Sequence, residues 1–257
     1  MDWQCGKLSR DLARVPGDLP EAGHSKRRNL RALQTRRKAW CIIERRFIDM
    51  PALSSRVHHA DQLWLPGLEA PPVPTDGLFF AVLPDANTAA GIAKLAQQMC
   101  GEIHSKSKPH AANRLHVTLR HLGNFAGGLP QELVDAAIKA AASIRMEPFS
   151  VEFDHTLTFA KKPRPGPRVL GGTEGLVGLY TLHDALVHAL QNAGFGDPAV
   201  LPNASHFTPH VTLAYGMPWI DERPIEAASW NVREFVLMHS LLGRTRHIAL
   251  ERWPLAA

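Results

Sequence analysis

The tetrapeptide His-Val-Thr-Leu occurs twice in this chain, at residues 116–119 and again at 210–213. In both copies polar residues alternate with apolar ones, which is the pattern of a half-buried β-strand. Residues i and i+2 of a strand face the same side, roughly 6–7 Å apart along the chain. Each histidine therefore shares a strand face with the threonine of its own copy. A fold that brings the two strands together would place two imidazoles and two hydroxyls in one cleft.

The elements around the two copies repeat in the same order. Each copy is preceded by an expected strand and an expected helix, at 78–83 and 86–100 for the first copy and at 168–170 and 176–193 for the second. Further strands are expected at 149–159, 232–242 and 246–252, and a further helix at 131–144. We predict an α+β fold of two pseudo-symmetric lobes. Each lobe is a mainly antiparallel sheet with helices packed outside, and the active-site cleft lies between the lobes.

The bulk composition is that of a globular protein. The 257 residues are 45% hydrophobic and 21% charged, and no apolar run reaches the roughly 18 residues that a membrane-spanning helix needs. The N-terminus lacks the pattern of a secretory signal. Three scattered cysteines without a Cys-x-x-Cys pair argue against a disulfide framework and favour a reducing compartment. We expect a cytoplasmic monomer with no membrane partner.

Charge divides the chain into unequal parts. Residues 1–60 hold 13 Lys and Arg against 6 Asp and Glu, so the rest of the chain is slightly acidic. We interpret 1–60 as a basic, disordered tail, with an RNA-binding arm as the alternative and Met50 as an alternative start. Residues 61–77 read as a proline-rich linker. The catalytic domain is expected at 78–257.

The residue types suit chemistry on a phosphate ester. In-line attack on phosphorus needs a base for the nucleophile and an acid for the leaving oxygen, and histidine can do either near neutral pH. A hydroxyl two residues away can donate to a non-bridging oxygen. A single His-x-Thr is more often structural, but two identical copies on expected strands favour a functional reading. Neither role requires a cofactor or a metal.

The sequence resembles the 2H phosphoesterases, and more closely their bacterial RNA 2′,3′-cyclic phosphodiesterases, which are similar to 2′–5′ RNA ligases. The segments that carry the resemblance are LFFAVLPD at 78–85, RLHVTLRHLG at 114–123, FTPHVTLAYG at 207–216 and HSLLGRTRHIALERWPL at 239–255. The resemblance covers about 76–255. It implies metal-independent opening of 2′,3′-cyclic phosphates of RNA or nucleotides to 2′-phosphates, with reversible 2′–5′ RNA ligation as a second reaction.

The resemblance also implies roles for individual residues. His116 would donate a proton to the leaving 3′ oxygen, and His210 would accept a proton from the attacking water. Thr118 and Thr212 would bind the phosphate oxygens. The further candidates are Arg120 and Phe207. Arg120 is expected on the strand face of His116 and Thr118, where it could neutralise the phosphate or be a charge at the rim, and Phe207 could stack on a base or pack in the core. Tyr215 stands where many relatives carry a basic residue, so phosphate neutralisation in that lobe is left open.

Three other functions compete with this reading. A metal site is disfavoured because zinc takes three or four protein ligands, and the threonines are poor ones. A non-catalytic RNA-binding module with a duplicated α+β fold would carry closely spaced aromatic residues and a positive body, and this chain has neither. A nucleotide-dependent ligase would carry a glycine-rich phosphate loop or a Lys-x-Asp-Gly motif, and neither is present. RNA ends or cyclic nucleotides remain the expected substrates.

Overall fold

A computed structural model describes residues 72–103, 107–160, 162–195 and 207–256 of the chain. The expected basic tail at 1–60 and residues 61–71 of the expected linker lie outside the described residues. The first strand of the described residues, β1, begins at Asp76, two residues earlier than the sequence pattern indicates.

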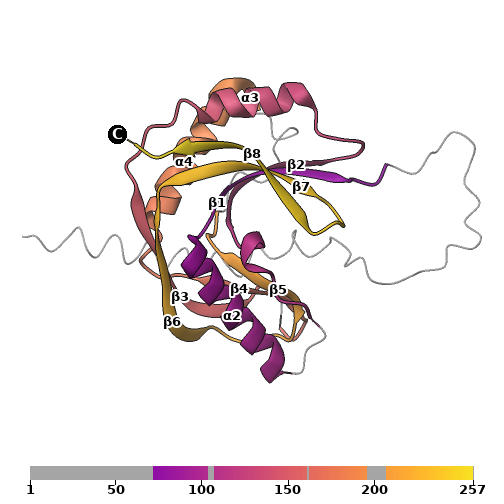
Figure 1. The fold of residues 1–257 in the computed structure, drawn as a ribbon, viewed down its shortest axis with the longest axis vertical. Helices are drawn as coiled ribbons and strands as arrows, with labels where there is room; N and C mark the ends of the chain where they lie inside the picture. The colour runs from indigo at the N-terminus through magenta and orange to yellow at the C-terminus, as the bar shows by residue number, and fades with distance from the viewer. Residues whose placement is uncertain (1–71, 104–106, 161, 196–206, 257) are drawn as a thin grey trace, which may run out of the picture. The chain divides into compact units, whose positions relative to one another are not determined.

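Eight antiparallel strands form one sheet in the order β6-β3-β4-β5-β2-β1-β7-β8 (Figure 1). The α+β prediction is therefore confirmed. The strands are β1 (Asp76–Val82), β2 (Val117–Phe125), β3 (Phe149–Thr158), β4 (Gly166–Gly171), β5 (Val211–Met217), β6 (Arg223–Val232), β7 (Glu234–Leu241) and β8 (Arg246–Pro254).

The sheet consists of two four-stranded halves that meet at one point. The halves are β8-β7-β1-β2 and β5-β4-β3-β6, and they join through a single residue pair, Val117 with Val211. Each half contains a strand, a helix and a motif strand in that order, β1-α2-β2 and β4-α4-β5. The two His-Val-Thr-Leu copies thus occupy the two inner strands at the junction of the pseudo-symmetric halves.

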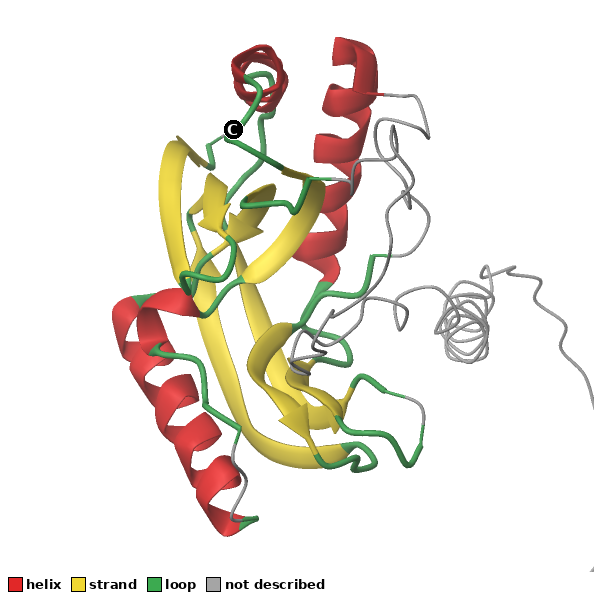
Figure 2. Cartoon of the chain, turned by 90° about the vertical axis from the view of Figure 1, so that its right-hand side faces the viewer, coloured by secondary structure: helices red, strands yellow, loops and turns green. Residues whose placement is uncertain are grey.

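Three helices lie around the periphery of the sheet (Figures 1 and 2). They are α2 (Ala86–Glu102), α3 (Gln131–Ala141) and α4 (Val177–Leu190). Asp85 caps α2 by accepting hydrogen bonds from the backbone N–H groups of Asn87 and Thr88. All three helices contribute to the main core, and they pack on the sheet face that carries Val117 and Val211. The motif histidines alternate with these valines, so they face the other side.

The strand β6 is an element that the sequence pattern does not predict. Most of its side chains are exposed, and it lies at the edge of the sheet, paired only with β3. An edge strand with little buried surface shows no alternation of apolar and polar residues, so backbone pairing defines it. By contrast, the helix expected at 176–193 is observed as α4 and a short turn, Gln191–Phe195, in which Gly194 takes a φ of 91°.

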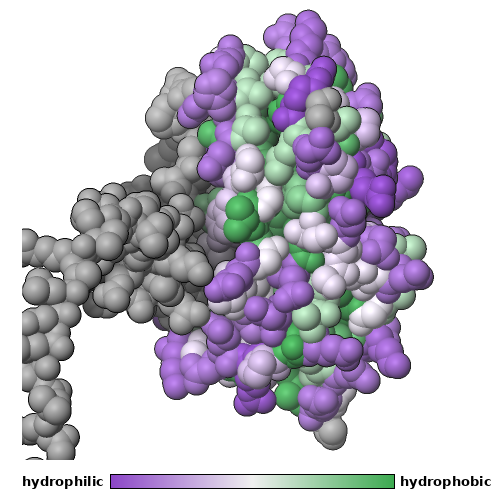
Figure 3. All heavy atoms as spheres, turned by 90° about the vertical axis from the view of Figure 1, so that its left-hand side faces the viewer, coloured by the Kyte–Doolittle hydropathy of each residue, from purple (hydrophilic) through white to green (hydrophobic). Residues whose placement is uncertain are grey.

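Few large apolar side chains are exposed in the described part of the chain. Figure 3 shows one face as a mixture of hydrophilic and hydrophobic residues. The exposed large hydrophobic residues are Val73, Ile103, Val177 and Tyr215. Among the described helices, none has the length and apolar character that a membrane crossing demands.

Candidate active site

The pairing of Val117 with Val211 sets the positions of the two motifs. In an antiparallel pair, this register places His116 across from Thr212 and His210 across from Thr118. Opposed side chains in such a pair are about 4.5–5.5 Å apart, and diagonal ones about 7–8 Å. The two imidazoles therefore lie on one diagonal and the two hydroxyls on the other, on the sheet face away from the main core. The structure brings the four predicted motif residues together.

Both imidazoles are held by the same backbone contact. His116 Nδ1 lies 2.8 Å from the carbonyl oxygen of Arg114, and His210 Nδ1 lies 2.8 Å from that of Thr208. A carbonyl oxygen only accepts hydrogen bonds, so each Nδ1 carries the proton and donates it. In the neutral ring the lone pair is then on Nε2. Each motif presents one Nε2 atom that can accept a proton or, once protonated, donate one.

In the ligand-free protein both imidazoles have a pKa below the ordinary value. The pKa of His116 is lowered to about 4, mainly by burial and in addition by His247, His210 and Arg114, while the bond to the Arg114 carbonyl opposes the shift. Burial also lowers the pKa of His210, and the bond to the Thr208 carbonyl opposes this. An anion bound between the rings would favour the charged form and reverse these shifts.

Aromatic side chains pack against the imidazole of each motif. The ring of His116 lies 5.0 Å from Phe79 of β1 and 5.2 Å, edge to face, from His247 of β8. The ring of His210 lies 4.8 Å from Phe159, which follows β3. Each half of the sheet thus supplies one phenylalanine as a wall for its own histidine. The packing restricts ring rotation, so each Nε2 atom keeps its direction.

Arg120 does not share the face of His116 and Thr118, so this part of the prediction is wrong. The strand β2 has a bulge after Thr118, since Thr118 pairs with Ala81 while Arg120 pairs with Phe80. The extra residue reverses the expected alternation. Phe80 belongs to the main core, whereas Ala81 belongs to the small cluster on the motif face. Arg120 pairs with Phe80, so its side chain faces the main core, and it is 8% exposed.

An electrostatic effect on helix α4 agrees with this placement of Arg120. Burial lowers the pKa of His183, a residue of α4, and the charge of Arg120 also lowers it. A corresponding register shift occurs in the other half, where Thr212 pairs with Val169 and Ala214 with Arg168. Ala214 packs there against Cys100 of α2. In both halves, the residue two positions beyond the threonine faces a helix.

Phe207 packs against α4. Its ring is stacked on His183, with centroids 4.2 Å apart and planes at 5°, and it meets Tyr180 edge to face at 5.6 Å. It also contacts the main core. One face of the ring is therefore already covered, which corresponds to the packing alternative for this residue rather than to base stacking.

Three basic residues beside the motifs were not selected from the sequence. His247 contacts His116 directly. Arg114 and His110 lie nearby. Burial and then Arg114 lower the pKa of His247, and burial followed by Arg114 and His116 lowers the pKa of His110 to about 4. A lone histidine on a closing hairpin carries no motif, so the sequence offered no signal for His247. For Arg114, its position two residues before His116 was the one available signal.

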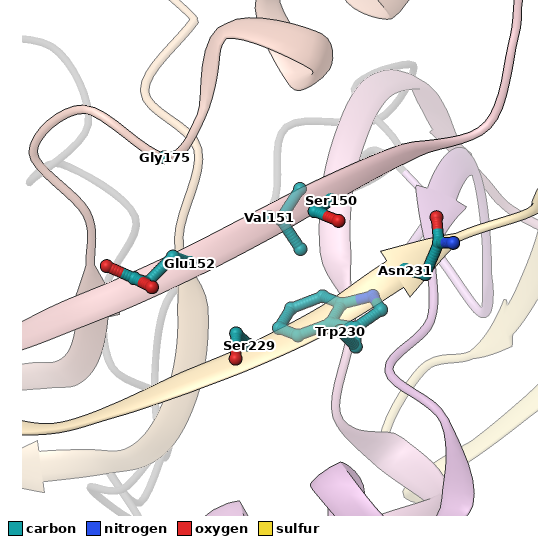
Figure 4. A pocket seen from close by; sticks show the side chains of 7 residues that line it. All are labelled: Ser150, Val151, Glu152, Gly175, Ser229, Trp230 and Asn231. Atoms are coloured by element: carbon teal, nitrogen blue, oxygen red, sulfur yellow. The ribbon is translucent and has the colours of Figure 1, made fainter.

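A separate hollow lies between β3 and β6, at the outer end of the sheet order (Figure 4). It has a volume of about 520 Å³, and Glu152 and Trp230 are among its lining residues. None of the motif residues lines it. In the part of the chain that the structure describes, no three His, Cys, Asp or Glu side chains are grouped as a metal site would need.

Two histidines on one diagonal of the strand junction, each presenting an Nε2 atom and each lying across the strand pair from a hydroxyl, are the arrangement expected of a two-histidine phosphoesterase. The model of the 2′-5′ RNA ligase superfamily matches residues 84–244, which is more than half of the chain. The chain therefore belongs to this superfamily, the 2H phosphoesterases, as its sequence resemblance indicates. A search of curated proteins finds no match.

Solved structures of similar proteins share the fold. LigT of Escherichia coli complexed with 3′-AMP is 26% identical, with a TM-score of 0.57, covering 72% of this chain and all of LigT. The same protein complexed with ATP gives 26% identity, a TM-score of 0.55 and the same coverage. The protein TT0787 of Thermus thermophilus is 23% identical with a TM-score of 0.59, covering 70% of this chain and 97% of that one, and is similar in fold.

Proposed function

We propose that this enzyme opens 2′,3′-cyclic phosphate ends of RNA or nucleotides to 2′-phosphates without a metal. The observation that carries the proposal is the pairing of Val117 with Val211, which sets His116 and His210 on one diagonal. Membership of a phosphoesterase and ligase superfamily supports the same chemistry. The structures of LigT with 3′-AMP and with phosphate further support a nucleotide phosphate as the ligand of this site.

The phosphate would lie between the two Nε2 atoms. His210 Nε2 accepts a proton from water, and the water oxygen bonds to phosphorus. The bond from phosphorus to the 3′ oxygen breaks, and protonated His116 Nε2 donates its proton to that oxygen. The product keeps its phosphate on the 2′ oxygen. With an RNA 5′ hydroxyl in place of water, the same steps would make a 2′–5′ linkage. In the reverse of that reaction the two histidines exchange their roles.

Thr118 and Thr212 would stabilise the charge that develops on phosphorus. Each hydroxyl lies across the strand pair from the histidine of the other motif, so both can donate to the non-bridging oxygens. The Nδ1–H bonds to the two carbonyls hold each ring in the tautomer that the reaction needs. This assigns the acid and base roles to Nε2 in both cases.

Hydrolysis of an oligonucleotide with a 2′,3′-cyclic phosphate end, in excess EDTA, tests the proposal. We expect the wild type to release the 2′-phosphate, and His116→Ala and His210→Ala each to lose at least about 10² in kcat. His188→Ala is the matched control, since His188 is an exposed residue of α4. Loss of activity in EDTA would point to a metal site. RNA binding without turnover in every variant would favour the non-catalytic RNA-binding module.

A good leaving group separates the roles of the two histidines. A cyclic phosphate with sulfur in place of the 3′ oxygen needs little help from a general acid. With this substrate we expect His116→Ala to recover most of its lost activity and His210→Ala to recover none. Recovery in His210→Ala instead would exchange the acid and base assignments.

A further inference from the structure

A group of basic side chains lies beside the first motif. We define the basic cluster as His110, Arg114 and His247. The ring of His247 meets that of His116 edge to face at 5.2 Å, and the Arg114 carbonyl oxygen accepts the Nδ1–H of His116. The charge of Arg114 acts on His110 and on His247. The cluster therefore adjoins the proposed acid without being part of either motif.

The basic cluster lies beyond the four motif residues, at one end of the strand junction. Thr118 with His210 and His116 with Thr212 form two successive levels of the junction. The segment before β2 continues along β5, where Pro109 forms a bridge with Ala214 and the His110 N–H donates to the Leu213 carbonyl oxygen at 2.7 Å. On β5, Leu213 is one residue after Thr212 and Ala214 is two residues after it. A ligand group at the cluster would adjoin the reacting phosphate and not coincide with it.

The basic cluster lacks a negative partner in the described part of the chain. His110 is 8% exposed and its Nδ1 has no hydrogen-bond partner, and the buried Nε of Arg114 has none either. No ion pair joins a carboxylate to Arg114, His110 or His247 among the described residues. Buried polar groups normally have hydrogen-bond partners, and a partly buried guanidinium is normally paired with an anion. An anionic ligand would satisfy both requirements.

An exposed aromatic ring borders the basic cluster. Tyr215 of β5 is 61% exposed, although most large apolar side chains in the described residues are buried. Its ring lies 5.3 Å from that of His110. Exposed aromatic rings next to positive charge are the usual elements of single-strand recognition, in which bases stack on the ring and phosphates meet the cations.

We propose that the basic cluster and Tyr215 form a subsite for the next nucleotide of an RNA substrate. The cluster takes the phosphodiester that links this nucleotide to the terminal one, and Tyr215 stacks on its base. The proposal rests on the proposed function, because it names a second position of the same substrate. It makes the enzyme selective for RNA ends over free cyclic mononucleotides.

The test compares two substrates on the full chain: a dinucleotide and a mononucleotide, both with a 2′,3′-cyclic phosphate. We expect Arg114→Gln and Tyr215→Ala each to lower the ratio of kcat/KM for the dinucleotide over the mononucleotide by about tenfold or more. Lys139→Gln is the control for lost charge, since Lys139 is an exposed residue of α3, and it should keep the wild-type ratio. Tyr215→Ala removes an exposed ring, so it gives a reading even if Arg114→Gln folds poorly.

The other outcomes of this comparison distinguish failure of the subsite from failure of the proposed function. An unchanged ratio in both variants, or an equal loss for both substrates, would overturn the subsite. A wild type that cleaves neither substrate would overturn the proposed function. In that case binding of a 3′-phosphorylated dinucleotide and of a 3′-phosphorylated mononucleotide is measured for the wild type and Arg114→Gln. Weaker binding of the dinucleotide alone supports the subsite, and equal effects overturn it.

Discussion

Binding of an anion to the paired motifs should bring protons into the protein. In the ligand-free protein the pKa of His116 is about 4, so only about one molecule in a thousand carries its imidazolium at pH 7. A negative charge about 4 Å from the ring, at an effective dielectric constant of about 20, stabilises the imidazolium by about 4 kcal/mol. This raises the pKa of His116 by about 3, to near neutral pH. The anion itself therefore produces the acid that the reaction needs.

Calorimetry with sulfate measures this proton uptake, because the charge of sulfate is constant between pH 5 and pH 8. Titrations in two buffers of different ionisation enthalpy give the number of protons bound with each sulfate. We expect uptake on the order of one proton per sulfate near pH 6. The pKa is higher in the bound state than in the free state, so sulfate affinity rises as the pH falls from neutral towards 4 and levels off below it.

Other histidines facing the same region share the uptake. Burial lowers the pKa of His210, His110 and His247 as well. We therefore expect His116→Gln to reduce the proton uptake without abolishing it, while His188→Gln leaves it unchanged. Sulfate that binds equally well at pH 5.5 and pH 8, with no protons taken up, would refute the electrostatic reasoning.

Three further predictions concern the pH profile, a core arginine and acid stability. In EDTA, kcat/KM should follow a bell-shaped curve, because one imidazole must be neutral and the other protonated; a flat profile between pH 5 and pH 9 contradicts the two-histidine mechanism. Arg120→Met should keep kcat/KM within about threefold, since Arg120 pairs with Phe80 and so faces the main core. A tenfold loss would instead indicate that Arg120 contacts the phosphate. The lowered pKa of His110 makes its contribution to stability fall as the pH drops below about 6.5, by about 2 kcal/mol at pH 5. Urea unfolding at pH 8 and pH 5 should show this loss in the wild type and a smaller one in His110→Phe.

The motif strands and their meeting point could be predicted because a local signal repeats. Alternation in His-Val-Thr-Leu defines the strand and its faces, and two copies in equivalent surroundings indicate the duplicated halves. The cap at Asp85 and the stop at Gly194 also follow from local residue preferences. Each of these features depends on residues within a few positions of one another.

The features that could not be predicted depend on contacts between distant segments. The face of Arg120 changes because β2 contains an extra residue where it pairs with β1, and no residue in that stretch marks the bulge. His247 reaches the site because β8 lies two strands from β1, which the hairpin alone does not reveal. The strand β6 exists because β3 offers it backbone partners. Pairing of this kind is decided by the whole sheet.

The crossed packing of the two halves has a consequence for synthesis of the protein on the ribosome. The helix α2, which follows β1, contacts β5, and the helix α4, which follows β4, contacts β2. When α2 leaves the ribosome, more than 100 residues must still be made before β5 follows it. The first half therefore exposes an apolar helix face throughout that time and cannot mature as an independent unit. We expect stable folding only once nearly the whole chain has emerged.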